Sequence, residues 1–573
     1  MNRTIETFLS CCSHHLVVDS ITVWTKYRRK FMNFMSVVGL ITLLAIAWLL
    51  SFHKKDVKFR PVLWGIGLQF VFALIILGKN NYSFLGMALL VGLLVTYTFH
   101  EKFRSILERS LVIGAGVILA GMLFLLNTKL NMPLGWLIFA VLLVYVLTAR
   151  FKKEAAPFLL ASFWVTLLVW LFVSGLTGTI LFSLFSEKVA AFLNLSDYGA
   201  EFLFGNLAKS NFFSPDSADF PNVGTWPGFG FLFAFKVLPT IIFFGGFMGV
   251  LYYLGIMQKI IEAISHFMRW TIGTSGAETL SCSANIFVGQ TEAPLLIKPF
   301  LKDMTNSELL TIMVGGFATI AGGVLAGYIA MGVPAGHLIA ASVMSAPAAL
   351  VIGKIIFPEK EHSVTAGDVD FPELTISENV LEAASNGITD GFKLAVNVGA
   401  MLIGFIALIA VLDVMLNFLD SLIDGKLLAG PYRAYAVQSL SPASGEYVGI
   451  FPGSLQTFFG NLLRPLAFLM GVPWEDSTLV GNLLGIKLSL NEFVAFGTLG
   501  DYIAKDAFGE RAIVISTYAL CGFANFSSIG IQIGGISALA PERRADLARV
   551  GLRAMFGGAL ASWTTATVAG IFL

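Results

Sequence analysis

Apolar runs of about the length needed to cross a lipid bilayer recur along this chain of 573 residues. Twelve runs predict membrane-spanning segments, at 34–52, 62–78, 84–99, 111–127, 133–149, 157–185, 228–257, 308–331, 335–357, 380–418, 511–540 and 549–573. Charged residues make up only 13% of the chain, about half the fraction typical of a soluble domain. The sequence therefore predicts an all-α polytopic membrane protein whose apolar surface is in contact with the lipid bilayer.

Two further apolar stretches, 277–301 and 455–498, are each broken midway by polar residues. Irregular backbone is tolerated at membrane depth only where it is buried in protein or lines a cavity. We therefore predict a re-entrant hairpin at each place instead of a simple span.

Lysine and arginine residues alternate between the connections of the first six predicted spans. The connections 53–61, 100–110 and 150–156 carry several each, whereas the intervening ones hold only Lys79 and Lys129. The positive-inside rule makes the three basic connections cytoplasmic. Counted onward, the C-terminus is predicted to lie outside.

The basic residues at 26–30 conflict with this orientation, because they would lie outside, directly before the first span. Either residues 1–31 fold back as an interfacial segment, or translation begins at Met32 or Met35. We favour the later start.

Two similar phrases in the second half of the chain point to an internal repeat. Residues 316–323 and residues 522–530 both begin Gly-Phe-Ala, lie inside a predicted span and follow a predicted hairpin with a polar centre. Positive-inside counting has the first hairpin entering from the cytoplasm and the second from outside. Inverted repeats with two re-entrant hairpins and two interrupted transmembrane helices are typical of secondary transporters.

Glu292 and Glu492 lie at the centres of the two hairpins. An ionisable residue at mid-membrane costs about 2.5–3.5 kcal/mol on insertion scales, so it usually has a function. Other conspicuous residues have simpler interpretations. We expect Gly245 and Gly249 to let helices approach closely, and Asp390 and Lys393 either to lie at the membrane interface or to form a local i,i+3 pair.

Several functional classes are disfavoured by composition and motifs. The net charge of +1 gives no basic excess for a nucleic-acid partner. The sequence has no phosphate-binding GxxxxGK[ST] run, no HExxH and no GxSxG. We therefore expect neither an enzyme nor an organic cofactor.

Three motifs in the repeats resemble those of the concentrative nucleoside transporters. They are Gly-Gln-Thr-Glu-Ala-Pro at 289–294, Asn-Glu-Phe-Val-Ala at 491–495 and Gly-Phe-Ala-Asn-Phe-Ser-Ser at 522–528. The resemblance covers roughly residues 34–78 and 195–573. It implies a homotrimer in the plasma membrane, the inner membrane of a bacterium, that imports nucleosides such as uridine, cytidine and adenosine with sodium by an elevator mechanism. Proton coupling and, less in keeping with paired hairpins, a passive channel remain alternatives.

The resemblance also assigns roles to individual residues. It places base recognition on Gln290, Thr291 and Glu292, with Val324 as an apolar contact and Gly289 hinting at a range that includes purines. It places ribose recognition on Glu492, Asn525 and Ser528, with Phe523 beside them. Sodium would be held by the Asn285 side chain, the Thr319 hydroxyl and the carbonyls of Val288 and Ile320.

The predicted organisation divides the chain into eight parts. They are an N-terminal basic segment (1–33), the first two scaffold helices (34–78), an inserted four-helix scaffold extension (79–190), an amphipathic segment with a scaffold helix and an interfacial helix (191–276), the first transport repeat (277–357), a cytoplasmic acidic linker (358–379), a long scaffold or oligomerisation helix with its loop (380–450) and the second transport repeat (451–573).

Overall fold

The computed structural model describes residues 28–79, 81–100, 106–130, 133–149, 156–208, 232–367, 377–432 and 449–573. Within these ranges the regular structure is helical throughout. Eleven of the described helices are long and apolar enough to cross a membrane. This confirms the predicted all-α polytopic class. The N-terminal segment before residue 28, on which the question of the start depends, lies outside the described residues.

The first half of the chain contains a helix at Arg28–Leu49, then α2 (Phe59–Leu77), α3 (Asn81–Thr98), α4 (Ile106–Leu130), α5 (Leu134–Ala149), α6 (Ala156–Val173), α7 (Gly178–Leu193), α8 (Ser196–Phe204), α9 (Phe233–Tyr253) and α10 (Ile256–Ile272). The second half contains α11 (Gly276–Ala284), α12 (Asn306–Ala318), α13 (Gly322–Ala330), α14 (Ala335–Ile356), α15 (Val380–Asp420), α16 (Leu455–Leu469), α17 (Ser477–Ser489), α18 (Glu492–Ala504), α19 (Glu510–Leu520), α20 (Phe526–Leu539) and α21 (Arg544–Phe572).

The single span predicted at 157–185 is wrong, because the chain there forms two helices, α6 and α7. Gly175 has a φ of 67°, a left-handed conformation that ends a helix and favours glycine. The Thr177 side chain then accepts a hydrogen bond from the Ile180 amide at 3.3 Å and caps the start of α7. A glycine followed by a capping threonine marks the end of one helix and the start of the next, although the surrounding residues form one continuous apolar run.

The second hairpin is also shorter than the stretch 455–498 predicted from the sequence. Residues 455–469 form a separate helix, α16, which ends before Gly471 with a φ of 98°. Pro473 follows and cannot continue a helix. The hairpin consists of α17 and α18, with its turn at Leu490 and Asn491.

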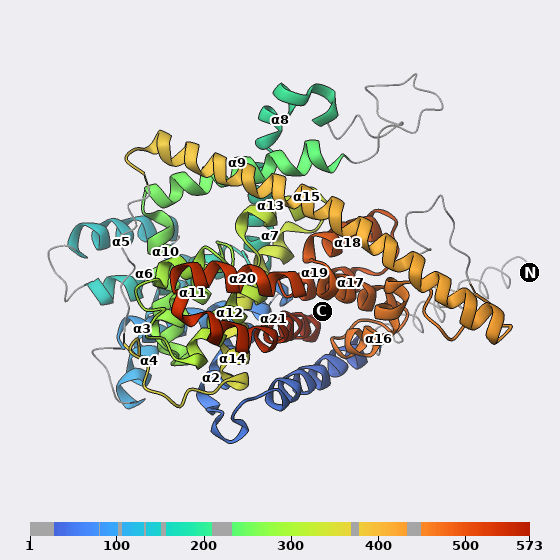
Figure 1. The fold of residues 1–573 in the computed structure, drawn as a ribbon. Coiled ribbons are helices and arrows are strands. Elements are labelled where there is room, and N and C mark those ends of the chain that lie inside the picture. The colour runs from blue at the N-terminus through green and yellow to red at the C-terminus, as the bar shows by residue number, and fades with distance from the viewer. Residues whose placement is uncertain are drawn as a thin grey trace, which may run out of the picture.

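The predicted order of hairpin, interrupted helix and long helix occurs twice. In the first repeat, α11 and a short 3-10 helix, η4 (Ala293–Ile297), are followed by α12, α13 and α14. In the second, α17 and α18 are followed by α19, α20 and α21. The helices α12, α14 and α21 pack against one another at the centre of the molecule (Figure 1) and are largely buried.

Helices α9 and α15 lie side by side along one face of this core (Figure 1). Glycines hold them together: a Cβ at Gly245 would come within 2.6 Å of the Gly387 carbonyl oxygen, and one at Gly249 within 2.5 Å of the Ala383 carbonyl oxygen. This confirms the packing role predicted for both glycines. Asp390 and Lys393, on the exposed part of α15, form the predicted local pair at 3.3 Å.

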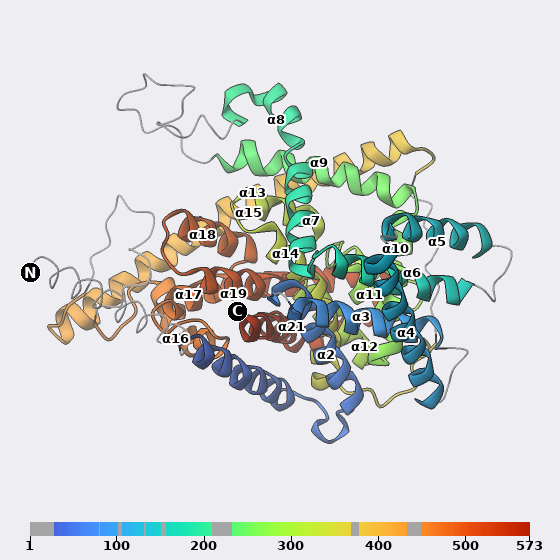
Figure 2. The ribbon, with the colours of Figure 1, turned by 180° about the vertical axis from the view of Figure 1, so that it is seen from behind.

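Helices α3–α6, in the segment predicted to be an insertion, lie at one end of the molecule, away from α16, α17 and α18 (Figure 2). Their buried residues form small clusters of their own, around Val95 and Val165 and around Leu123 and Val169. They join the rest of the fold chiefly where α3 packs on α2.

Candidate functional site

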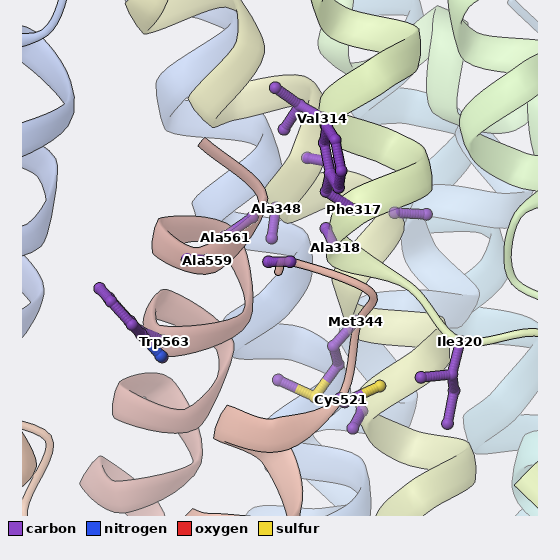
Figure 3. Close-up of a cluster of buried hydrophobic side chains, with 14 of the residues drawn as sticks. Val314, Phe317, Ala318, Ile320, Met344, Ala348, Cys521, Ala559, Ala561 and Trp563 are labelled. Carbon is purple, nitrogen blue, oxygen red and sulfur yellow. The ribbon is translucent and has the colours of Figure 1, made fainter. Parts of the chain in front are cut away.

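The interruptions of the two repeats cross in direct contact at the centre of the fold. The first lies between α12 and α13, and the second between α19 and α20. Gly522 in the second interruption has a φ of 128°, and a Cβ there would come within 2.5 Å of the Phe317 carbonyl oxygen in the last turn of α12, directly before the first interruption. Figure 3 shows the segment around Cys521 next to Phe317, Ala318 and Ile320. Backbone groups released by both interruptions therefore meet in one place.

Asn525 organises the second interruption. Its side-chain oxygen accepts hydrogen bonds from the Ser528 amide at 2.9 Å and the Ser527 hydroxyl at 2.8 Å, which caps the start of α20. The side-chain amide remains free to point the other way, and it donates to Glu492 at 3.2 Å. Asn525 thus links this interruption to the second hairpin.

Glu492 is the first residue of α18 and is 5% exposed. A helix N-terminus favours a negative charge, and Asn491 caps the same helix by accepting from the Val494 amide at 2.9 Å. Tyr328 of α13 donates to the other carboxylate oxygen of Glu492 at 3.1 Å. One carboxylate therefore joins the second hairpin to interrupted helices of both repeats.

Gln290 connects the tip of the first hairpin to the same interruption. Its side-chain amide donates to the Ser528 hydroxyl at 3.4 Å, and its carbonyl oxygen accepts from Gln532 at 3.0 Å. Gln532 also donates to the Met313 carbonyl at 3.2 Å. A continuous polar chain thus spans both repeats; it consists of Tyr328, Glu492, Asn525, Ser528, Gln290 and Gln532. The side-chain carbonyl oxygen of Gln532 is buried and has no hydrogen-bond partner among the described residues.

Glu292 lies apart from this polar chain. It accepts a hydrogen bond from the Gly289 amide at 3.0 Å and is exposed to a cavity of about 540 Å³. This cavity lies between the first hairpin and helices α9 and α15, and its lining includes Tyr252, Gln258 and Asn386. The start of α13 borders it but packs directly on α9, where a Cβ at Gly322 would come within 2.8 Å of the Phe244 ring. The two hairpin carboxylates therefore have different surroundings.

The remaining residues predicted for the substrate lie around these groups. Thr291 lies against α20, since a Cβ at Gly535 would come within 2.9 Å of its methyl group. Val324 is buried one helical turn before Tyr328, and Phe523 is half-buried beside Gly522.

Asn285 is the residue of the expected sodium site whose surroundings are most informative. It follows α11 directly, it is 1% exposed, and neither its side-chain oxygen nor its nitrogen has a hydrogen-bond partner among the described residues. Thr319, Val288 and Ile320 are likewise buried, and the Thr319 hydroxyl bonds the Gly315 carbonyl at 2.9 Å. A buried, unpaired amide oxygen next to an interrupted helix fits a hard cation with oxygen ligands.

Sequence reasoning missed two members of the polar chain, Tyr328 and Gln532. Each lies four residues after a predicted site residue on the same helix, Val324 and Ser528 respectively. Residues at i and i+4 share a helix face, so this spacing could have identified both.

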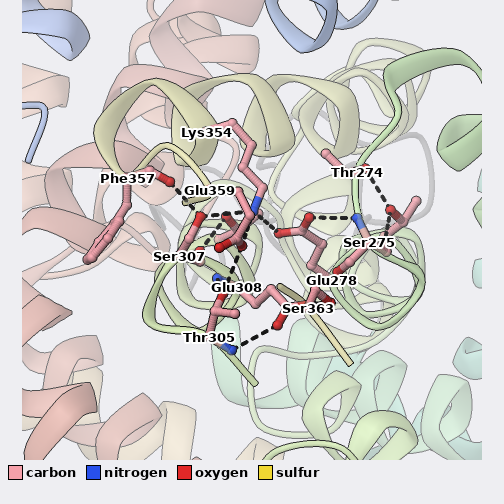
Figure 4. A network of polar contacts seen from close by, with 12 residues as sticks. Thr274, Ser275, Glu278, Thr305, Ser307, Glu308, Lys354, Phe357, Glu359 and Ser363 are labelled. Atoms are coloured by element: carbon pink, nitrogen blue, oxygen red, sulfur yellow. Dashed lines mark hydrogen bonds and ion pairs between the residues drawn. The ribbon is translucent and has the colours of Figure 1, made fainter. Parts of the chain in front are cut away.

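A buried ionic network fixes the base of the first hairpin (Figure 4). Lys354 of α14 lies 2.8 Å from Glu278 of α11 and donates to Ser307 of α12 at 2.9 Å. Glu308 accepts from Ser363 and Thr365 in the following linker, at 2.6 and 2.9 Å. The network ties the hairpin to α12, to α14 and to the linker after α14.

Three family models match the chain. Residues 38–98 match one described as "Na+ dependent nucleoside transporter N-terminus", residues 234–335 match "Nucleoside recognition", and residues 337–570 match "Na+ dependent nucleoside transporter C-terminus". The matched segments cover most of both repeats and also α3, and they leave α4, α5 and α6 unmatched.

Curated relatives agree with these matches. An uncharacterized transporter of Haemophilus influenzae is 44% identical over 395 residues, which is 68% of this chain and 84% of the relative. The sodium/nucleoside cotransporter 1 of Rattus norvegicus is 39% identical over 505 residues, which is 83% of this chain and 69% of the relative.

Solved structures resemble the chain over nearly its whole length. The structure of CNTnw in an inward-facing substrate-bound state has a TM-score of 0.65 and 32% identity, covering 94% of this chain and 98% of that one. A variant of CNTnw in an outward-facing state has a TM-score of 0.68 and 30% identity, covering 95% and 99%.

Proposed function

The chain belongs to the Na+ dependent nucleoside transporter family, and on that premise we propose that it imports nucleosides by sodium-coupled symport. The observation that carries this proposal is the polar chain from Tyr328 to Gln532, which joins the two repeats at their interruptions. Groups of this kind suit a neutral solute with donors and acceptors at both ends, such as a nucleoside.

The two ends of the polar chain suggest a division of roles. Glu492 and Asn525 can bond vicinal hydroxyls, so we assign the ribose to them together with Ser528. Gln290 and the unpaired carbonyl oxygen of Gln532 offer a donor and an acceptor for the edge of a base. Thr291, at the same hairpin tip, completes this end, and we assign Glu292 to the base from the cavity that it lines. Gly289 leaves room, and Val324 and Phe523 give apolar contacts. A site with buried polar groups rejects analogues that leave those groups unpaired.

Sodium is the proposed driving ion, bound by Asn285, Thr319 and the carbonyls of Val288 and Ile320. A nucleoside carries no charge, so the ion must supply the free energy. One monovalent cation moving through 100 mV supplies about 2.3 kcal/mol, which corresponds to roughly fifty-fold accumulation at about 1.4 kcal/mol per tenfold. A sodium concentration gradient adds to this.

We further propose an elevator motion of the two repeats, 277–357 and 451–573, against a scaffold. Two features support this division. Helices α9 and α15 are locked together by glycines, as expected of a rigid support, and the cavity that Glu292 lines runs between them and the first repeat. A seam that is left partly unfilled by a cavity offers less resistance to sliding than one that is close-packed throughout.

The scaffold also carries our proposals for assembly and orientation. The long helix α15 exposes large apolar side chains, among them Ile403, Val411 and Phe418, and we propose that part of this face meets other copies in a homotrimer. The C-terminus, at Leu573, is proposed to lie outside the plasma or bacterial inner membrane. Native mass spectrometry tests the homotrimer, and labelling of a C-terminal cysteine in intact cells tests the location of the C-terminus.

Uptake of labelled uridine into proteoliposomes tests the transport function. With an inward sodium gradient we expect accumulation above equilibrium, abolished when potassium replaces sodium. Accumulation driven by a proton gradient without sodium would assign proton coupling instead, and equilibration without accumulation would indicate a passive channel. Conversion of uridine into another compound would contradict the assignment to a transporter.

A further inference from the structure

Lys487 is a fully buried lysine in the second hairpin, at 0% exposure. Its ammonium group donates to the Ala519 carbonyl at 2.9 Å and to the Ser562 hydroxyl at 2.9 Å. Among the described residues no carboxylate lies within ion-pair distance of it. Glu492 acts on it only through space, beyond ion-pair distance. Burial of an ammonium group without a directly bonded counter-charge is costly, so the contacts that it makes need an explanation.

The partners of Lys487 place it at the end of an interrupted helix. Ala519 lies in the last turn of α19, directly before the second interruption. The last carbonyls of a helix have no partner within the helix and carry partial negative charge, so a cation there is favoured. Ser562 of α21 completes the contact from the far side. Lys487 itself lies five residues before Glu492 in the hairpin.

The first repeat has the same arrangement of parts without a lysine. Its hairpin supplies Asn285, whose side chain is buried and unpaired among the described residues, and its interruption begins at the end of α12 with Thr319. This is where the proposed function puts the sodium ion. In each repeat, then, a hairpin residue faces the C-terminal end of the first half of an interrupted helix, and only the second repeat places a lysine at that end.

We propose that Lys487 is a tethered cation that takes, in the second repeat, the part that sodium takes in the first. Its ammonium group holds the end of α19 in place and thereby positions Asn525 and Ser528, which lie directly beyond it. Because a tethered charge returns with the protein in every cycle, it contributes nothing to net ion flux. The second interruption therefore needs no ion of its own, and sodium coupling rests on the first. This inference rests on the proposed function.

The test uses Lys487→Met in the full-length protein, because methionine keeps the apolar stem and removes the charge. Thermal unfolding in detergent reports stabilisation by sodium alone and by uridine in sodium. We expect sodium to stabilise the variant as it does the unmodified protein, whereas the uridine dissociation constant rises at least tenfold. The matched control is Lys188→Met, which removes an exposed lysine of α7 and should change neither quantity.

A uridine dissociation constant within twofold of the unmodified protein would overturn the proposal. Loss of stabilisation by sodium and uridine together would also overturn it, because Lys487 would then support the fold in general. Ser562→Ala removes one acceptor and retains the charge, so a smaller effect than that of Lys487→Met is expected; an equal effect contradicts the tethered-cation role. If the unmodified protein shows no sodium-dependent uridine uptake, the proposed function itself fails, which is a separate outcome.

Discussion

Gly522 lies against the carbonyl oxygen of Phe317, at a distance that would leave 2.5 Å between that oxygen and a Cβ. The two residues belong to different repeats, and their contact brings the two helix interruptions together. Gly522 has a φ of 128°, which L-residues with side chains rarely adopt. Close approach and backbone conformation therefore both require glycine at this position.

Gly522→Ala is expected to separate the interruptions. Relief of the overlap with a backbone oxygen costs about 1–3 kcal/mol, and the φ adds strain. We expect a lower unfolding temperature and at least a tenfold loss of uridine uptake. The control is Gly530→Ala on α20, where a Cβ meets no atom within 4 Å and alanine should be neutral or slightly stabilising. Similar results for both variants would contradict the packing argument.

Tyr328→Phe is expected to weaken recognition of the ribose. The substitution removes the 3.1 Å hydrogen bond to Glu492, and hydrogen bonds to charged groups contribute about 1.5–3 kcal/mol. We expect KM for uridine to rise about tenfold or more and KM for 2′-deoxyuridine to rise less. Tyr198→Phe, at a residue 80% exposed, serves as the control. If KM changed equally for the two substrates, Tyr328 and Glu492 would not contribute to recognition of the ribose.

Gln290→Ala and Gln532→Ala are expected to alter base preference, whereas Glu492→Gln reduces uptake of all ribose-bearing substrates. The two glutamines share a 3.0 Å hydrogen bond, so their effects should not add; coupling energies of about 0.5–3 kcal/mol are usual for such pairs. Competition by a panel of purine and pyrimidine nucleosides measures the preference. Identical substrate profiles for Gln290→Ala and Glu492→Gln would show that the division of roles is wrong.

Asn285→Leu is expected to raise the sodium concentration needed for half-maximal uptake at least tenfold. Leucine fills a similar volume but offers no oxygen ligand, and the Asn285 side chain has no other partner among the described residues that the change could disrupt. Asn461→Leu, which removes only a bond to the Thr457 carbonyl in α16, is the control. An unchanged sodium requirement in Asn285→Leu would remove this residue from the proposed site.

Glu278→Gln alone is expected to destabilise the first hairpin more than the double change Glu278→Gln with Lys354→Met. Removal of one partner from a buried ion pair typically costs about 3–5 kcal/mol, because the other charge stays buried and unpaired. Lys354 keeps a second ion pair, to Glu359 at 3.3 Å, so a smaller cost is expected here. Removal of both charges relieves part of that cost. Unfolding temperatures in detergent measure the difference; a double variant less stable than the single one would contradict the view that the charges compensate each other.

Local signals in the sequence identified most of the elements but not all of their ends. The interruptions near Thr319 and Asn525 and the two hairpins were predicted from Gly, Ser, Thr and Asn inside apolar runs. The breaks at Gly175 and Gly471 were missed, since each lies within a long apolar stretch and is marked only by a glycine followed by a capping residue or a proline.

The sequence indicates several residues of the candidate site but not the hydrogen bonds that connect them. The sequence motifs single out Gln290, Glu492, Asn525 and Ser528, and the structure joins them by hydrogen bonds. Glu292 belongs to the same motif as Gln290, yet it faces the cavity beside α9 and α15. Tyr328 and Gln532 are identified only by the structure.

The sequence by itself determined the membrane-spanning class, the positions of the interruptions and the polar residues near them. All of these depend on the length and the local chemistry of short segments. Only the tertiary structure decided that Gln290 bonds Ser528, 238 positions further on, and that Lys487 reaches the end of α19. Such contacts depend on how helices from both repeats pack around one point, and the distances between their side chains are set by that packing and not by any neighbour in the chain.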